Sequence, residues 1–254
     1  MIKFFRNIRK KLAAENKVAP YLRYAIGEIV LVVIGILIAL GINNWNQNRN
    51  NRTSANIHLE TVAQNIEEDL LQLDYMYKFT DTTLSYSSKL KRQFETLDPI
   101  DDNTTRYMTY LLLEKTTTPN KSGLETINNS GELPYINKSI QEILLKYYNI
   151  LDNISKREEI SNTFIKNKYE PYFFEHYSYI LNIKTNWESV QEYYKEDPRT
   201  PKEIDKENFL SDSQLEAMTF GRYFQIEQQH VLYKDAIEVA NQLMQKIEAN
   251  DQGF

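Results

Sequence analysis

The sequence predicts an all-α protein in which one N-terminal transmembrane helix precedes an extracytoplasmic antiparallel helical bundle. Three observations predict this class. An apolar run fills residues 25–42 and carries one charge, Glu28. In the chain that follows, apolar residues recur at steps of three and four, which is typical of amphipathic helices. Helix breakers are sparse, with 7 glycines and 7 prolines in 254 residues, and no strand-like alternation of useful length stands out.

The apolar run is long enough to cross a membrane. At about 1.5 Å per residue it spans roughly 27 Å, close to a hydrocarbon core of about 30 Å. Tyr21 and Tyr24 precede the run and Trp45 follows it, as expected of residues at membrane interfaces. The competing interpretation is a cleaved signal peptide. A signal peptide would have a small-x-small cleavage site after the apolar core, and the sequence has no such site there. We therefore expect residues 24–45 to be a retained transmembrane helix.

Charge sets the expected orientation. Seven Lys and Arg residues lie within residues 1–23, whereas only Arg49 and Arg52 closely follow the run. The positive-inside rule therefore places residues 1–23 in the cytoplasm and residues 46–254 in the periplasm, with the span in the inner membrane. The body formed by residues 46–254 is acidic, which argues against nucleic acid as a partner. The chain has no cysteine, which excludes disulfides and thiol catalysis.

Three residues of the run, Glu28, Gly35 and Ala39, share one helix face with Asn43, which directly follows it. Gly35 and Ala39 form a small-xxx-small pair, which lets two helix backbones approach closely. Intramembrane acids usually face protein or water. We therefore expect this face to mediate association of spans in a homo-oligomer. The alternative is that Glu28 lies close enough to the interface for its carboxylate to reach headgroup water.

The segment from Tyr21 to Asn46 resembles the signature of an uncharacterised family of single-span membrane proteins, a domain of unknown function found in Bacteroidetes-type Gram-negative bacteria. The opening Met-Ile-Lys-Phe-Phe-Arg and residues 124–136 resemble further parts of that family. The resemblance implies a membrane anchor and an envelope location. It implies no activity, cofactor or catalytic residue.

Within the body, the apolar pattern predicts three long helices joined by shorter ones. The first runs from Leu59 to Asp98-Pro99, and residues 43–52 either link it to the span or continue the same helix. The second begins at Ile136, is kinked or broken at Pro171 and resumes over residues 172–183. The last begins at a capping box, Ser213 to Glu216. We expect shorter helices over residues 104–115, residues 124–129 and the stretch after Asn186.

No catalytic or metal-binding constellation stands out. Glu227-x-x-His230 is half of a di-iron bundle signature, but the second Glu-x-x-His that this chemistry needs does not occur. Glycine-rich phosphate loops and nucleophile elbows are also missing from the sequence. We therefore expect a non-enzymatic protein with no metal and no cofactor.

A dense aromatic stretch surrounds Pro171. Tyr172, Phe173, His176 and Tyr177 could line a ligand pocket or a partner surface, because aromatic walls with polar tips bind ligands well. The plainer interpretation is core packing around the proline. The expected function is thus a membrane-anchored scaffold that self-associates or assembles with an envelope protein. The alternative is a sensory or ligand-binding bundle that acts through a partner protein.

Overall fold

The computed structural model describes residues 18–180, 188–200 and 202–251, and these residues form helices and loops without a strand. The all-α class predicted from the sequence is confirmed. The chain divides into two compact units, residues 1–55 and 56–254. Most of the expected basic N-terminal segment and the expected cap Asn186 lie outside the described residues.

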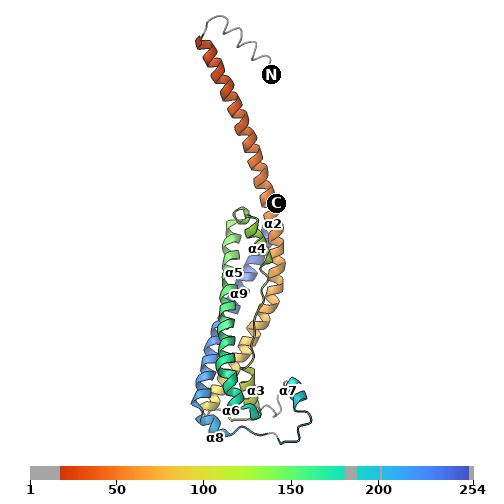
Figure 1. Ribbon diagram of the computed structural model, residues 1–254, viewed down its shortest axis with the longest axis vertical. Coiled ribbons are helices and arrows are strands. Elements are labelled where there is room, and N and C mark those ends of the chain that lie inside the picture. Colours follow the sequence, from red (N-terminus) through yellow and green to blue (C-terminus); the bar gives the residue numbers. More distant parts are fainter. Residues whose placement is uncertain (1–17, 181–187, 201, 252–254) are drawn as a thin grey trace. The chain divides into compact units, whose positions relative to one another are not determined.

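The first helix, α2, runs from Val18 to Phe94 over 77 residues (Figure 1). It is not interrupted over residues 43–52, so this polar stretch continues the helix instead of linking two helices. Its apolar residues between Ile29 and Ile42 are all exposed. The helix is long and apolar enough there to cross a membrane.

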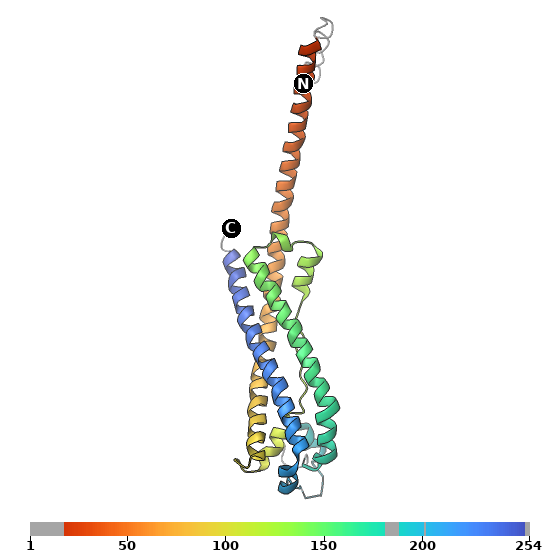
Figure 2. The same cartoon turned by 90° about the vertical axis from the view of Figure 1, so that its left-hand side faces the viewer.

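The second unit contains three long helices: the part of α2 from residue 56 onward, α5 (Lys138–Phe164) and α9 (Ser213–Asp251). Figure 2 shows that α9 runs opposite to both others, whereas α2 and α5 run in the same direction. The antiparallel arrangement predicted from the sequence therefore applies to α9 only. The shared core is made of buried aliphatic and aromatic side chains, including Leu59, Val62, Ile66, Leu73, Leu144, Leu151, Ile154, Ile226, Tyr233, Ala236 and Leu243.

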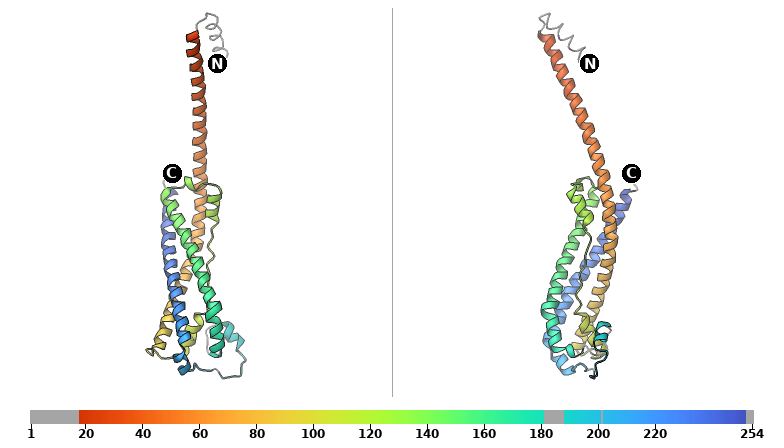
Figure 3. Two further views of the ribbon diagram at one scale, coloured as in Figure 1. Left: turned by 60° about the vertical axis from the view of Figure 1, so that its left-hand side comes forward. Right: turned by 45° about the vertical axis from the view of Figure 1, so that its right-hand side comes forward.

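The return path between α2 and α5 explains the parallel pair. Two short helices, α3 (Asp102–Tyr110) and α4 (Ser122–Asn129), lie at opposite ends of the second unit. Residues 113–121, which we call the strap, join them along the length of the bundle (Figure 3). At about 3.3 Å per residue the strap covers roughly 30 Å, the length of a helix of about 20 residues. The strap thus takes the place of a fourth helix.

Side chains of all three long helices hold the strap. On α2, Asp69 accepts the backbone N–H of Asn120 at 2.9 Å. On α5, both carboxylate oxygens of Glu158 accept the N–H of Thr117, at 3.0 and 3.1 Å. A strap has no helical hydrogen bonds of its own, so its buried N–H groups need such acceptors.

On α9, the guanidinium of Arg222 donates to the carbonyls of Leu111 and Leu113, at 3.2 and 3.1 Å, and to the hydroxyl of Ser161. Arg222 is only 1% exposed. The two carbonyls follow the C-terminus of α3, where the helix dipole favours a cation. Burial lowers the pKa of Arg222 to about 10, so the side chain remains charged at neutral pH.

The aromatic stretch forms one end of the bundle. A π-helical turn, Ile165–Tyr169, follows α5, and α6 (Glu170–His176) begins directly after it, with Pro171 in its first turn. The sequence predicted a kink or a break at Pro171. The helical path is not broken there, and the irregularity is a π turn directly before the proline, whose bonds span one residue more than those of an α-helix. The resumed helix expected over residues 172–183 is shorter: α6 ends at His176, and a 3₁₀ turn, Ser178–Ile180, follows. Residues 181–183 of that expectation lie outside the described residues.

Two further short helices, α7 (Glu188–Tyr193) and α8 (Lys206–Ser211), precede α9. The sequence did not predict α8. It carries Phe209, whose ring stacks on Phe94 at a centroid distance of 4.6 Å and closes the core at this end. The cap of α9 also differs from the expected capping box: Asp212, not Ser213, accepts the N–H of Leu215 at 2.8 Å.

Candidate functional site

The expected association face of the span lies on the exposed part of α2. Ala39 and Asn43 are exposed, and a Cβ added at Gly35 would meet no atom within 4 Å. Glu28 is half-buried. No described residue therefore covers the small-residue pair, and its association with a second span stays a prediction.

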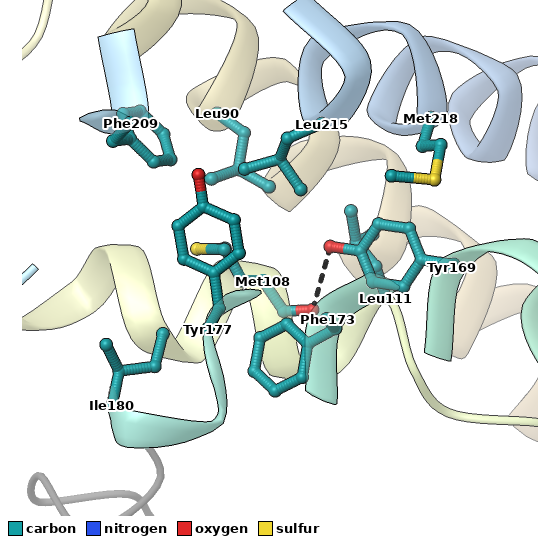
Figure 4. Packing of buried hydrophobic residues seen from close by; sticks show 10 residues of the cluster. All are labelled: Leu90, Met108, Leu111, Tyr169, Phe173, Tyr177, Ile180, Phe209, Leu215 and Met218. Carbon is teal, nitrogen blue, oxygen red and sulfur yellow. Dashed lines mark hydrogen bonds between the residues drawn. The ribbon is translucent and has the colours of Figure 1, made fainter. Parts of the chain in front are cut away.

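The aromatic residues that the sequence singled out divide into two classes. Phe173 and Tyr177 are fully buried and pack with Met108, Phe209 and Leu215 (Figure 4). Tyr172 is half-buried and His176 is exposed, and their rings lie 4.3 Å apart. Only the latter pair can be reached by a ligand or partner while the end of the bundle stays folded.

Asp212 connects the aromatic end to α9. Its carboxylate accepts the hydroxyls of Tyr172 and Tyr177, at 2.7 and 2.6 Å, as well as the N–H of Leu215. Burial acts to raise the pKa of Asp212, but these hydrogen bonds outweigh it and hold that pKa below its usual value. Burial and the bond to Asp212 raise the pKa of Tyr172 to about 12. The cluster is an N-cap with two added donors, which accounts for it without a catalytic role.

His230, half of the di-iron signature, lies between α9 and α2. Its ring stacks on Tyr77 at 4.3 Å, and its Nδ1 is 2.9 Å from the hydroxyl of Thr80. Among the described residues, no three His, Asp or Glu side chains are grouped closely enough to hold a metal ion. Glu227 is exposed. His230 thus has a packing role in the contact between α9 and α2.

A groove with a cavity volume of about 550 Å³ lies between the last turns of α2 and the first turns of α9. We call it the α2/α9 groove. Its α2 wall carries Ser87, Ser88, Lys91 and Phe94, and its α9 wall carries Ser213, Glu216, Ala217, Thr219, Phe220 and Tyr223. The lining is thus mainly aromatic and small, with one basic and one acidic residue on opposite walls.

Two features distinguish this groove from ordinary surface. Phe220 and Phe224 lie one turn apart on α9 and are 69% and 54% exposed. Thr219 is 3% exposed, and its hydroxyl has no hydrogen-bond partner among the described residues. An unsatisfied buried hydroxyl costs free energy, and two adjoining exposed aromatics extend the apolar surface beside the groove.

The sequence interpretation did not single out this surface. Tyr223, on the α9 wall of the groove, is 39% exposed. The signal that could have found this surface is the position of Phe220, Phe224 and Val231: steps of four and seven put them together, opposite the core residue Arg222. A second apolar stripe on an amphipathic helix indicates a second surface to cover.

The chain matches the model of one protein family over residues 28–184, which is more than half of its length. That family is described as a family of unknown function, in agreement with the resemblance in the sequence, while a Bacteroidetes-type origin stays a prediction. Curated proteins and solved structures gave no match. The chain therefore belongs to the family of unknown function DUF6090.

Proposed function

We propose that the protein is a membrane-anchored, non-enzymatic scaffold of the bacterial envelope that assembles with further copies of itself. The observation that carries the anchor is the exposed apolar part of α2. Every residue from Ile29 to Ile42 is exposed, and a continuous apolar surface of this kind needs lipid or protein to cover it.

The polar end of the apolar stretch supports a membrane in particular. Trp45 follows the stretch, and the guanidinium of Arg49 lies 5.9 Å from the centre of its ring. An amphipathic aromatic beside a cation suits the headgroup region. The uneven distribution of Lys and Arg supports residues 1–23 in the cytoplasm and the second unit in the periplasm.

The alternative, a sensory or ligand-binding bundle, loses much of its motivation. It depended on Tyr172, Phe173, His176 and Tyr177 as pocket walls, and two of these are packed inside the core.

The native chain has no cysteine, so single cysteines can report topology without background. A cysteine placed at exposed Ser155 on α5, outside the α2/α9 groove, should react with a membrane-impermeant maleimide in intact spheroplasts, and one at Lys3 should react only after lysis. Labelling of Lys3→Cys before lysis, or release of the protein by alkaline carbonate, would contradict the proposed anchor and orientation.

Association of the spans is tested in the same background. Cysteines at Gly35 and Ala39 should crosslink between chains in membranes, because they lie on the expected association face. Cysteines at Ile34 and Leu37, on other faces, are the matched controls. Crosslinking at none of the four positions would remove the oligomeric span from the proposal.

A further inference from the structure

We propose that the α2/α9 groove is a self-docking surface, in which two copies of the body pair through a two-fold axis that passes through the groove. This inference rests on the proposed self-association and extends it from the span to the periplasmic body. The argument depends on the shape, the exposure and the charges of the groove.

The walls of the groove favour a macromolecule over a small molecule. A volume of about 550 Å³ is in the range of ligand pockets, but such pockets bury most of the ligand. Here Phe220 is 69% exposed, Tyr223 is 39% exposed and the side chain of Lys91 is 66% exposed. A small ligand would therefore stay open to water on one side, whereas an apposed protein surface would cover both the groove and its rim.

A second copy of the chain fits the groove because the projecting aromatic side chains and the hollow lie side by side on the same surface. Phe220 and Phe224 project from α9, and the hollow opens beside them towards α2. A two-fold axis pairs the same patch on both subunits, so each copy would insert its aromatic residues into the hollow of the other.

The charges of the groove fit the same symmetry. Lys91 lies on the α2 wall and Glu216 on the α9 wall. A two-fold rotation about an axis midway between them places the Lys91 position of one copy over the Glu216 position of the other, twice. The bond that Lys91 makes with Glu95, the residue that directly follows α2, is an exposed i,i+4 pair, which contributes little and can rearrange.

The symmetry predicts a specific pattern for charge reversal. Lys91→Glu puts acid against acid at both contacts of its homodimer, and Glu216→Lys puts base against base at both contacts. When the two variants are mixed, however, each contact joins one acid and one base. Two singly charge-reversed chains should therefore prefer each other over themselves, a result that interactions within one chain do not produce.

The experiment uses the full chain in membranes, with a single cysteine at exposed Ala217 on the groove wall and a short bis-maleimide. The parent chain should give crosslinked dimers. Each charge variant alone should give several-fold fewer, and co-expression of the two, with different tags, should restore dimers that carry both tags. Phe220→Ser/Phe224→Ser should also lose the dimers, while Leu71→Ser, an equally apolar change at a 77% exposed site on α2 outside the groove, should not.

Circular dichroism of each variant confirms that the helices remain folded. The proposal is overturned if the Ala217→Cys chain gives no dimers, or if the mixed charge variants pair no better than each alone. It is also overturned if Phe220→Ser/Phe224→Ser keeps the dimers but loses a different co-purifying protein, which would assign the groove to a foreign partner. Crosslinking at Gly35 is read separately, so failure of the groove and failure of the span are distinguishable.

Discussion

Tyr147 on α5 donates its hydroxyl to Asp69 on α2 over 3.0 Å, and the same carboxylate accepts the backbone N–H of Asn120 in the strap. Glu158 repeats this arrangement: it accepts the hydroxyl of Tyr233 on α9 at 2.6 Å and the N–H of Thr117. Two buried carboxylates, each with a tyrosine, therefore fix the strap to the helices at two heights.

We expect the contribution of these two carboxylates to the free energy of unfolding to decrease as pH rises. Burial raises the pKa of Asp69 and of Glu158 above their usual values, although hydrogen bonds from the strap and the tyrosines act in the opposite direction. An acid with a higher pKa in the folded state binds more protons when folded. Its contribution to the free energy of unfolding therefore decreases as pH rises from about 4 through the folded pKa.

Asp69→Asn/Glu158→Gln should remove this decrease, because neither amide titrates. Urea unfolding of the full chain in detergent, followed between about pH 4 and pH 8, measures it. Asp74→Asn is the matched control, since Asp74 is an exposed carboxylate of the same helix. An unchanged pH slope in the double variant would show that other groups govern this range.

Arg222→Lys should destabilise the protein by roughly 2–4 kcal/mol. The guanidinium donates to two carbonyls and one hydroxyl from three directions, and a lysine ammonium cannot reach all of them from the same buried stem. Urea unfolding at pH 7 measures the loss. Arg106→Lys, at an exposed position of α3, should change the free energy of unfolding by less than about 0.5 kcal/mol; equal losses in both variants would contradict the role given to Arg222.

Asp212→Asn should weaken the start of α9, with a loss of about 1–2 kcal/mol at neutral pH. Because the folded pKa of Asp212 is lowered, its stabilisation is present above the unfolded pKa of about 4 and is lost as pH falls through the folded value. The difference between parent and variant should therefore shrink in acid, opposite in sign to the effect of Asp69 and Glu158. Tyr177→Phe removes one donor to the carboxylate and should reproduce part of the loss.

Gly123→Ala should cost about 1–3 kcal/mol, because α4 approaches α2 too closely for a side chain. A Cβ at this position would lie 2.7 Å from Cγ2 of Val62 and 3.0 Å from its backbone nitrogen. Thermal unfolding in detergent measures the effect. Gly27→Ala, where a Cβ would meet nothing within 4 Å, is the control and should not lower the melting temperature.

Periodic and local signals predicted much of this fold. The steps of three and four from Leu59 onward correctly placed the long helices, because a helix that packs on a core needs one apolar face. The path of the strap could not be predicted in this way. Residues 113–121 are held by Asp69, Glu158 and Arg222, which are distant in sequence, and no local pattern encodes such contacts.

The helix ends near Pro171 and Asp212 were predicted less accurately than the long helices themselves. Pro171 was expected to kink or break the second long helix, and the structure has a π-helical turn, Ile165–Tyr169, directly before it, after which α6 continues to His176. Asp212 was overlooked as a cap because Ser213 and Glu216 form the more familiar pattern. The core-facing apolar residues dominate the pattern of α9, so the sequence analysis did not identify the second stripe that contains Phe220 and Phe224.

The number of residues in the strap also sets the distance between α3 and α4. A helix of the same length could lose or gain one residue with an axial change of about 1.5 Å, but an outstretched chain changes by about 3.3 Å and reverses which way each peptide faces. Thr117 and Asn120 would then miss Glu158 and Asp69 together. Residues 113–121 should therefore tolerate side-chain replacement far better than any change in their number.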